Sequence, residues 1–193
     1  MPLDRRQLKR NLRLFAIARS DLVAAQRCVN LLQQVIRVTG ADAIRQPEFA
    51  PLQHALVITY ARPFTPTKTS QRLTGRWARF EDPRLNRAHA TALRMRNSFV
   101  AHSDEEQRQV TIIPPGAPAV RGHKMRLPAD SEVVGIRISS QLLPTSMIDA
   151  LAHCCRDVGG RLNQEVWRLQ GELYDGRTDL PSEPFLVTDD DGL

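Results

Sequence analysis

The chain has 193 residues, which is enough for one domain that buries a core without disulfides or structural metals. Hydrophobic residues make up 41% of it and charged residues 25%, as in an ordinary water-soluble globular protein. No apolar run approaches the roughly 20 residues of a membrane helix, and the basic N-terminus lacks the apolar stretch of a signal peptide. Three cysteines, two of them adjacent, exclude a disulfide framework, so we expect a cytoplasmic protein with reduced thiols.

The formal charge of +6 is unevenly distributed. From Glu172 to the last residue there are seven acids and one base, so the preceding residues carry a net charge of +12. Two interpretations of this basic body are open. It suits an anionic partner such as RNA or DNA, or it is a solvated arginine-rich surface.

The first half of the chain predicts helices. Residues 3–19 alternate Arg or Lys with apolar residues at helical spacing, which predicts a helix with one basic face. Residues 22–38 repeat the helical spacing up to Gly40, and Ser20-Asp21 either cap this second helix or lie inside one longer helix. A further helix is predicted from Pro51 to Tyr60, before two prolines.

The second half adds two helices and two strands. Asp82-Pro83 introduces a helix that we expect over residues 84–101. Residues 109–113 and 132–138 are typical of strands and predict a small antiparallel hairpin that leans on the helices. A long helix follows from Pro144, and its Gly159-Gly160 pair is expected to weaken or kink it.

The sequence therefore predicts a mainly α fold. We expect a bundle of four or five helices over residues 1–173, with a two-stranded β insertion at about 107–140. The acidic residues 174–193 are expected to form a flexible tail. Whether this tail masks the basic body in cis is a question for experiment.

The stretch most suggestive of chemistry runs Arg-Asn-Ser-Phe-Val-Ala-His-Ser-Asp from Arg96 to Asp104. A guanidinium, a carboxamide and an imidazole can together bind a phosphate, orient an oxygen and move a proton. On one helix, however, Arg96 and His102 point about 120° apart with about 9 Å of rise between them. Arg96 and Ser103 share a face with His89 because the three lie seven residues apart.

This stretch resembles the signature of HEPN-domain proteins, in which an Arg and a polar residue precede a His by four to six residues. Here five residues separate Arg96 from His102, and Asn97 fills the polar position. The context is similar to the AbiU2 type, in which an earlier helix carries a Tyr-x-Arg-Pro-Phe segment. Tyr60 to Phe64 match that segment, and the helical layout matches over roughly residues 20–170.

The resemblance implies a helical bundle that forms a homodimer, with the Arg/His helices of two protomers lining one cleft. Many such proteins are metal-independent endoribonucleases that act as toxins or in antiphage defence, and others are non-catalytic binding modules. It implies Arg96, Asn97 and His102 as catalytic residues. RNA and a protein partner such as an antitoxin are then the expected partners, without a cofactor.

Structural explanations stand beside this interpretation. A His at a helix end is usually a cap or a surface residue, and an Arg on a packing face often pairs with an acid. The acids at 104–106 would repel phosphate or lie on the far side of a turn. Tyr60, Arg62 and Ser103 are candidates for substrate binding, but Tyr60 packed on the core beside a solvent-facing Arg62 is the alternative.

The densest cluster of bases lies near the N-terminus. It could bind a nucleic-acid backbone without sequence preference, contact an acidic partner, or form a solvated helix face. Its members are Arg5, Arg6, Lys9, Arg10 and Arg13. No metal site is expected, because His153-Cys154-Cys155 has no second Cys/His motif at ligand spacing.

Overall fold

The computed structural model describes residues 4–66, 72–101, 108–113, 135–140, 142–175 and Val187. For residues 98–101 and the two strands it describes the backbone alone. The chain divides into two compact units, residues 1–96 with 144–193 and residues 97–143. Each unit is treated by itself below.

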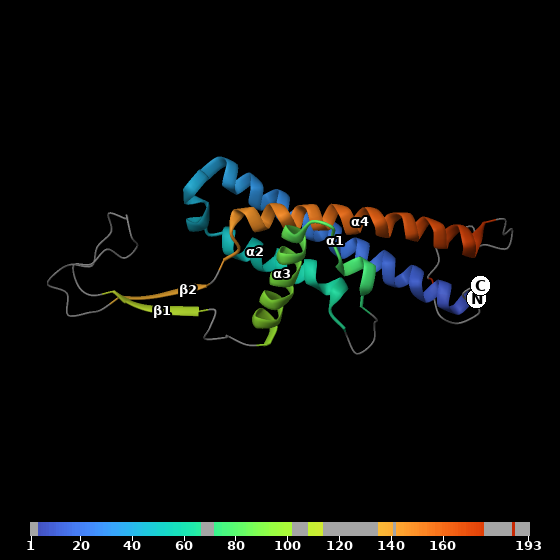
Figure 1. Ribbon diagram of the computed structural model, residues 1–193. Helices are drawn as coiled ribbons and strands as arrows, with labels where there is room; N and C mark the ends of the chain where they lie inside the picture. The colour runs from blue at the N-terminus through green and yellow to red at the C-terminus, as the bar shows by residue number, and fades with distance from the viewer. Residues whose placement is uncertain are drawn as a thin grey trace. The chain divides into compact units, whose positions relative to one another are not determined.

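Helix α1 (Arg5–Thr39) is one continuous helix of 35 residues, about 52 Å long (Figure 1). The Asp4 side chain caps its N-terminus by accepting the backbone N–H of Gln7 at 2.7 Å. Gly40 ends it with a φ of 57°, and its N–H bonds the carbonyl of Ile36. Ser20-Asp21 therefore lie inside a longer helix, the second of the two predicted arrangements.

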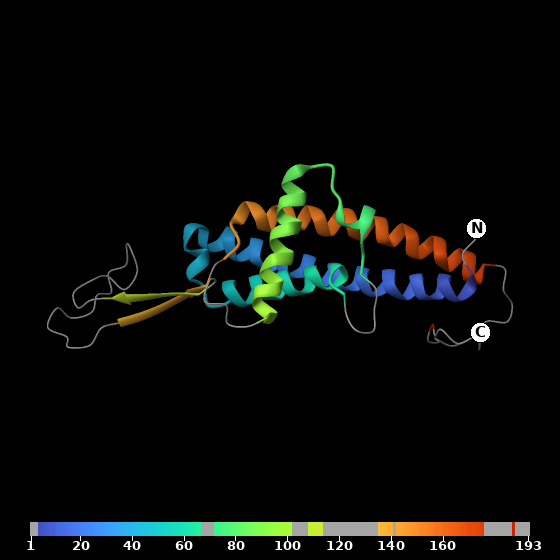
Figure 2. The ribbon, with the colours of Figure 1, turned by 60° about the horizontal axis from the view of Figure 1, so that its bottom comes forward.

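The core of the first unit lies between α1 and helix α4 (Thr145–Tyr174), which run side by side and antiparallel (Figures 1 and 2). Both helices bury apolar side chains three or four residues apart, which keeps one stripe of each turned toward the other. In α1 these include Ala18, Leu22, Ala25, Val29 and Leu32; in α4 they include Leu151, Cys155, Val158, Leu162 and Leu169. The helix α4 continues through Gly159-Gly160 without a break.

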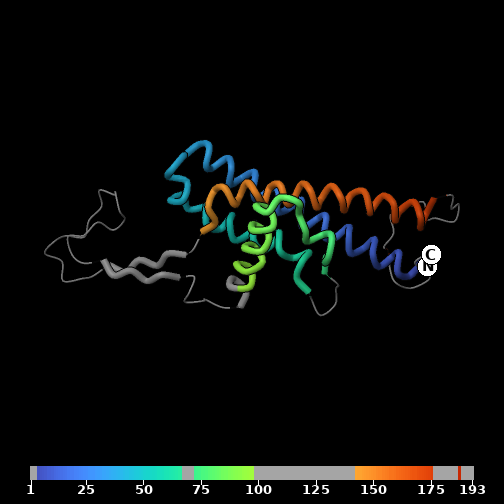
Figure 3. Tube along the Cα trace, in the orientation of Figure 1, coloured from blue at the N-terminus to red at the C-terminus, as the bar shows by residue number. Residues whose placement is uncertain are grey.

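Helix α2 (Phe49–Ala61) lies along α1 (Figure 3). It carries apolar residues around most of its circumference, as expected for a helix covered on several sides. Its buried residues include Phe49, Leu56, Val57 and Tyr60. A short 3-10 turn, η2 (Arg62–Phe64), follows at once and contains Pro63, which ends the α-helical hydrogen bonding.

Helix α3 (Pro83–Ala101) begins as the sequence predicts and crosses the other helices steeply in Figure 1. The Asp82 carboxylate accepts the backbone N–H of Arg84 at 2.8 Å, and Pro83 needs no partner for its nitrogen. Before it, the 3-10 turn η3 (Gly75–Ala78) buries Trp77. A further 3-10 turn, η1 (Gly40–Arg45), joins α1 to α2.

The second unit contains two six-residue strands, β1 (Arg108–Ile113) and β2 (Gly135–Ser140). They pair antiparallel, with Arg108 opposite Ser140 and Ile113 opposite Gly135. Residues 114–134, which connect them, lie outside the described residues. The packing of the predicted hairpin against the helices stays a prediction.

The prediction of a mainly helical bundle is confirmed, with four α-helices in the described part of the chain. None of the described helices is long and apolar enough to cross a membrane. Most of the predicted acidic tail, residues 176–186 and 188–193, falls outside the description. Val187 is described, and it packs against the bundle.

Candidate functional site

The last turns of α3 carry the first two residues of the predicted catalytic set. Arg96 is half-buried and Asn97 is exposed. Upstream on the same helix, Ala88, His89, Ala92 and Met95 are buried, so Arg96 lies at the edge of the packed face. This agrees with the seven-residue spacing that relates Arg96 to His89.

His102 and Ser103 lie outside the described residues. The backbone of α3 is helical to Ala101, so the chain reaches His102 directly after the last helical residue. The predicted divergence of Arg96 and His102 requires a helix that includes both residues, and the described helix ends at Ala101. Their relative geometry beyond that point stays a prediction.

Tyr60 and His89 form a hydrogen-bonded pair inside the first unit. Tyr60 has no exposed surface and His89 is 7% exposed, and 2.9 Å separate the Tyr60 hydroxyl from His89 Nδ1. The His89 ring lies edge-on to Phe64 at 4.6 Å between centroids and tilted against Phe80 at 5.7 Å. These contacts tie α2, η2 and α3 together.

Burial shifts the pKa values of both His89 and Tyr60. Burial lowers the pKa of His89, because its charged form loses hydration among aromatic rings. Burial also raises the pKa of Tyr60 well above its ordinary value, with the nearby Cys154 acting in the same direction. A neutral imidazole and a neutral phenol therefore share the buried bond.

Tyr60 and Arg62 do not lie together on a surface that a substrate could reach. Tyr60 is in the core, whereas the Arg62 side chain is 58% exposed and its Nη1 lies 3.7 Å from Asp21 Oδ1 on α1. This placement matches the alternative in which Tyr60 packs on the core and Arg62 faces solvent. The Tyr60 hydroxyl is bonded to His89 inside the core, and substrate binding by Tyr60 and Arg62 stays a prediction.

The basic cluster at the start of α1 is exposed in part. Arg5, Arg6, Arg10 and Arg13 are exposed, but Lys9 is only 3% exposed. Lys9 precedes Leu12 by three residues, and Leu12 belongs to an apolar cluster with Val166, Leu169 and Leu173. Four of the five bases of this cluster are therefore exposed and the stem of Lys9 lies beside packed side chains, while nucleic-acid binding by the cluster stays a prediction.

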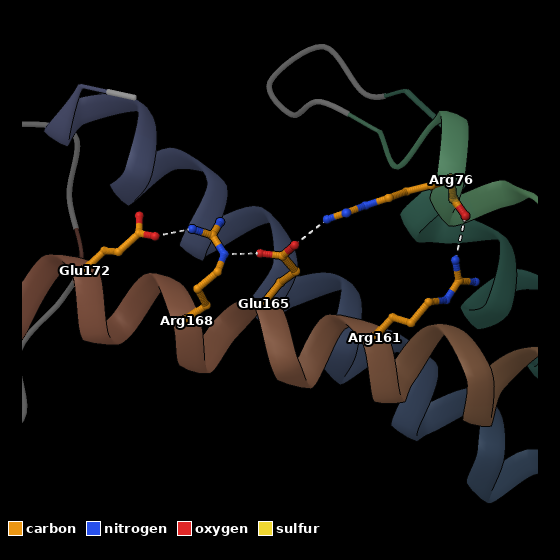
Figure 4. A network of polar contacts seen from close by, with 5 residues as sticks. All are labelled: Arg76, Arg161, Glu165, Arg168 and Glu172. Carbon is orange, nitrogen blue, oxygen red and sulfur yellow. Dashed lines mark hydrogen bonds and ion pairs between the residues drawn. The ribbon is translucent and has the colours of Figure 1, made fainter. Parts of the chain in front are cut away.

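A second polar site, which the sequence analysis did not identify, joins η3 to α4 (Figure 4). Glu165 accepts hydrogen bonds from Arg76 on η3 and, at 2.6 Å, from Nε of Arg168. Arg168 also bonds Glu172, and Arg161 Nη1 donates to the carbonyl of Arg76 at 2.6 Å. The ladder holds η3 onto α4 over the buried Trp77.

Two arginines of this site lie over the Trp77 ring. The Arg76 guanidinium lies 4.8 Å and the Arg161 guanidinium 5.8 Å from the Trp77 ring centroid, within cation–π range. Phe15 of α1 packs against the ring at 5.1 Å between centroids. The spacing of 161, 165 and 168 on one helix face was visible in the sequence, but their partner in η3 was not.

An open pocket of about 380 Å³ lies beside this ladder, lined by Arg76, Trp77, Arg161, Gln164, Glu165 and Arg168. Partial burial acts to raise the pKa of Glu165, but hydrogen bonds from Arg168 and Arg76 hold it below its ordinary value. Asp157 pairs with Arg161, Glu172 pairs with Arg168, and Glu165 pairs with both Arg76 and Arg168, so three carboxylates balance the three arginines. The arrangement is therefore a neutral clamp between two chain segments.

Cys154 and Cys155 are buried thiols of α4. Burial raises the pKa of the Cys154 thiol to about 11 and that of Cys155 to about 12, so both stay protonated near neutral pH. The described residues contain no group of three His, Cys, Asp or Glu side chains that could hold a metal ion.

No protein-family model, no curated protein and no solved structure matches the chain.

Proposed function

We propose that the chain is an HEPN-like protein that binds RNA and cleaves it without a metal. The supporting observation is the course of α3, which stays helical to Ala101. Arg96 lies at the edge of the packed face, Asn97 is exposed, and His102 follows Ala101 directly in the sequence. In the proposal, Arg96 binds phosphate and His102 transfers a proton.

The proposed reaction uses the 2′-hydroxyl of RNA as the nucleophile. The 2′-oxygen forms a bond to the adjacent phosphorus and gives its proton to an imidazole, while the bond from phosphorus to the 5′-oxygen breaks. The leaving 5′-oxygen takes a proton from an acid, which leaves 2′,3′-cyclic phosphate and 5′-hydroxyl ends. His102 serves in proton transfer because an ordinary imidazole titrates near neutral pH, and Arg96 binds the phosphoryl oxygens as a fork.

The proposal includes a homodimer. On a helix that continued through His102, Arg96 and His102 would point about 120° apart, so a single chain would not direct both at one phosphate. Two α3 ends in a shared cleft supply two copies of each group, and Asn97 then orients either the phosphate or an imidazole. An RNA-cleaving dimer of this kind would suit a toxin or an antiphage-defence protein, with an antitoxin as its partner.

Cleavage of mixed RNA in EDTA tests the catalytic claim. The parent is compared with His102→Ala and with His153→Ala, which removes an exposed histidine of α4. We expect the parent and His153→Ala to cut alike and His102→Ala to lose about 100-fold or more, the usual contribution of an acid–base group. Equal cutting by His102→Ala, or no cutting by the parent, would refute this role.

The second candidate is a non-catalytic module that binds nucleic acid or an acidic protein. The exposed Arg5, Arg6, Arg10 and Arg13 on one helix favour it. Such binding weakens steeply with salt, since each phosphate contact releases counterions. Salt-sensitive RNA binding without cleavage would support this candidate over the first.

A further inference from the structure

Helix α1 leaves several large apolar side chains in solvent. Among the described residues, six large apolar side chains are exposed, and four of them lie on this helix: Ile17, Val23, Leu31 and Val38. The exposed fractions of Ile17, Leu31 and Val38 are 63%, 49% and 79%. Single exposed apolar residues are ordinary on a protein surface, whereas a regular row of them indicates a contact surface.

Three of these side chains belong to one heptad repeat. Ile17, Leu31 and Val38 are separated by multiples of seven residues, and the half-buried Ala24 fills the remaining position of this outer row. A second row of half-buried residues lies three positions earlier in each repeat and consists of Leu14, Asp21, Cys28 and Val35. The two rows together have the spacing of a coiled-coil seam over about three heptads, and the outer row spans about 32 Å. We call these eight residues the outer seam of α1.

One flank of the outer seam is the helical bundle itself. The buried Ala18, Ala25 and Leu32 each follow a member of the outer row directly, so the seam borders the stripe that packs on α4. Its one charged member, Asp21, pairs with Arg62 at 3.7 Å. A partner on the seam therefore meets apolar side chains and an acid that already has a base beside it.

The other flank of the outer seam is exposed and basic. In the heptad repeat its flanking positions are residues 6, 13, 20, 27 and 34, all of which are exposed. Three of them are Arg6, Arg13 and Arg27, none is acidic, and Asp21 is the only acid of residues 5–39. Two copies of α1 paired antiparallel along this seam would set arginines against arginines. A helix with carboxylates at its own flanking positions would instead form ion pairs with them.

The outer row also differs from a face that binds RNA or lipid. The bases of single-stranded RNA stack on aromatic side chains, and the outer row contains none. Interfacial helices bury a broad apolar face, whereas the outer row is one side chain wide, with the exposed Arg27 and Gln34 on its solvent side. A narrow row at heptad spacing fits between the side chains of a facing helix.

We propose that the outer seam of α1 binds a helix of another protein, with apolar residues at heptad spacing and acidic residues beside them. Such a helix covers the outer row and pairs its carboxylates with the arginines of the exposed flank. Because the seam repeats every seven residues rather than every 7.2, the partner wraps α1 with a left-handed twist. The proposal does not rest on RNA cleavage, so a failure of the proposed function leaves it standing.

Binding of two synthetic peptides to the full chain tests this partner chemistry. Each peptide has about four heptads with Leu at both seam positions; one carries Glu and the other Lys at the flanking positions, so like charges keep each from associating with itself. We expect the Glu peptide to bind with a Kd below about 100 µM and the Lys peptide to bind at least about tenfold more weakly. Equal binding of both peptides, or no binding of the Glu peptide at that concentration, would overturn the proposal.

A matched pair of double variants locates the bound peptide. Ile17→Gln with Leu31→Gln removes two members of the outer row and should weaken binding of the Glu peptide about tenfold. Ile44→Gln with Trp167→Gln removes two exposed apolar side chains outside the seam and should leave binding unchanged. All four side chains are exposed, so the urea midpoint of each double variant should stay near that of the parent. A seam variant that binds as tightly as the parent would overturn the proposal.

Charge reversal and the competing occupants complete the test. Arg27→Glu should weaken binding of the Glu peptide about fivefold, and Arg156→Glu, at an exposed position of α4, should weaken it much less. The bound peptide should also slow alkylation of Cys28, the half-buried thiol of the seam, severalfold. If the Glu peptide does not bind, and Ile17→Gln with Leu31→Gln instead weakens self-association or binding to RNA or to phosphatidylserine vesicles, the seam has that occupant and the proposal is overturned.

Discussion

The buried bond between Tyr60 and His89 predicts a measurable loss of stability in Tyr60→Phe. The substitution keeps the ring, and with it the contact to Phe64 at 5.5 Å, but removes the hydroxyl that lies 2.9 Å from His89 Nδ1. Because Tyr60 is fully buried, water does not replace the lost partner, and His89 Nδ1 is left unpaired. A buried polar group without a partner costs about 1–3 kcal/mol, so the free energy of unfolding should fall by that amount.

Urea unfolding at pH 7.5, followed by circular dichroism, measures this change. A double-mutant cycle with His89→Phe isolates the bond: in the His89→Phe background, Tyr60→Phe should cost less than in the parent, because no imidazole remains to be left unpaired. A loss in Tyr60→Phe below about 0.3 kcal/mol, or the same loss in both backgrounds, would refute the assignment of the bond as a stabilising contact.

Three further predictions concern stability and thiol chemistry. Burial lowers the pKa of His89 in the folded state, so the unfolded chain binds a proton that the folded chain does not. The free energy of unfolding is therefore highest above about pH 6.5. It falls as the pH drops below that value, by at most about 1.4 kcal/mol per pH unit. In His89→Phe, the free energy of unfolding should depend less on pH between 6.5 and 5, and an unchanged slope against pH would contradict this. Gly160→Ala should stabilise by about 0.5–1 kcal/mol, since the position is exposed, helical and has no atom within 4 Å of an added Cβ; a lower urea midpoint would contradict it. At pH 8, alkylation followed by mass spectrometry should modify Cys154 and Cys155 only after unfolding, and should reach the half-buried Cys28 first; fast labelling of the pair in native protein would show that their burial is wrong.

The helices could be predicted because their signals are local. Apolar spacing, the Asp82-Pro83 start of α3 and the terminating Gly40 each act within one or two turns. Whether residues 3–38 form one helix or two was open, because Ser20-Asp21 serve equally as a cap or as helical residues. The continuous core stripe from Ala18 to Leu32 selects one helix, and it depends on α4, which begins at Thr145, far away in the sequence.

Side-chain environments were harder to predict, because they depend on contacts between distant segments. His89 gave no sign in the sequence that it would pair with Tyr60, 29 residues earlier. Lys9 looked like its exposed neighbours, but it is buried, three residues before Leu12 of the apolar cluster shared by α1 and α4. The Arg76–Glu165 contact likewise joins residues 89 apart in sequence.

The dependence of RNA cleavage on His102 is the most direct measure of the proposed function. Purified parent protein in excess EDTA, incubated with a 5′-labelled RNA, should release fragments that end in 2′,3′-cyclic phosphate, and His102→Ala should release about 100-fold fewer in the same time. Fragments produced equally by both proteins, or no fragments from the parent, would contradict the account of Arg96, Asn97 and His102 as a metal-independent catalytic set.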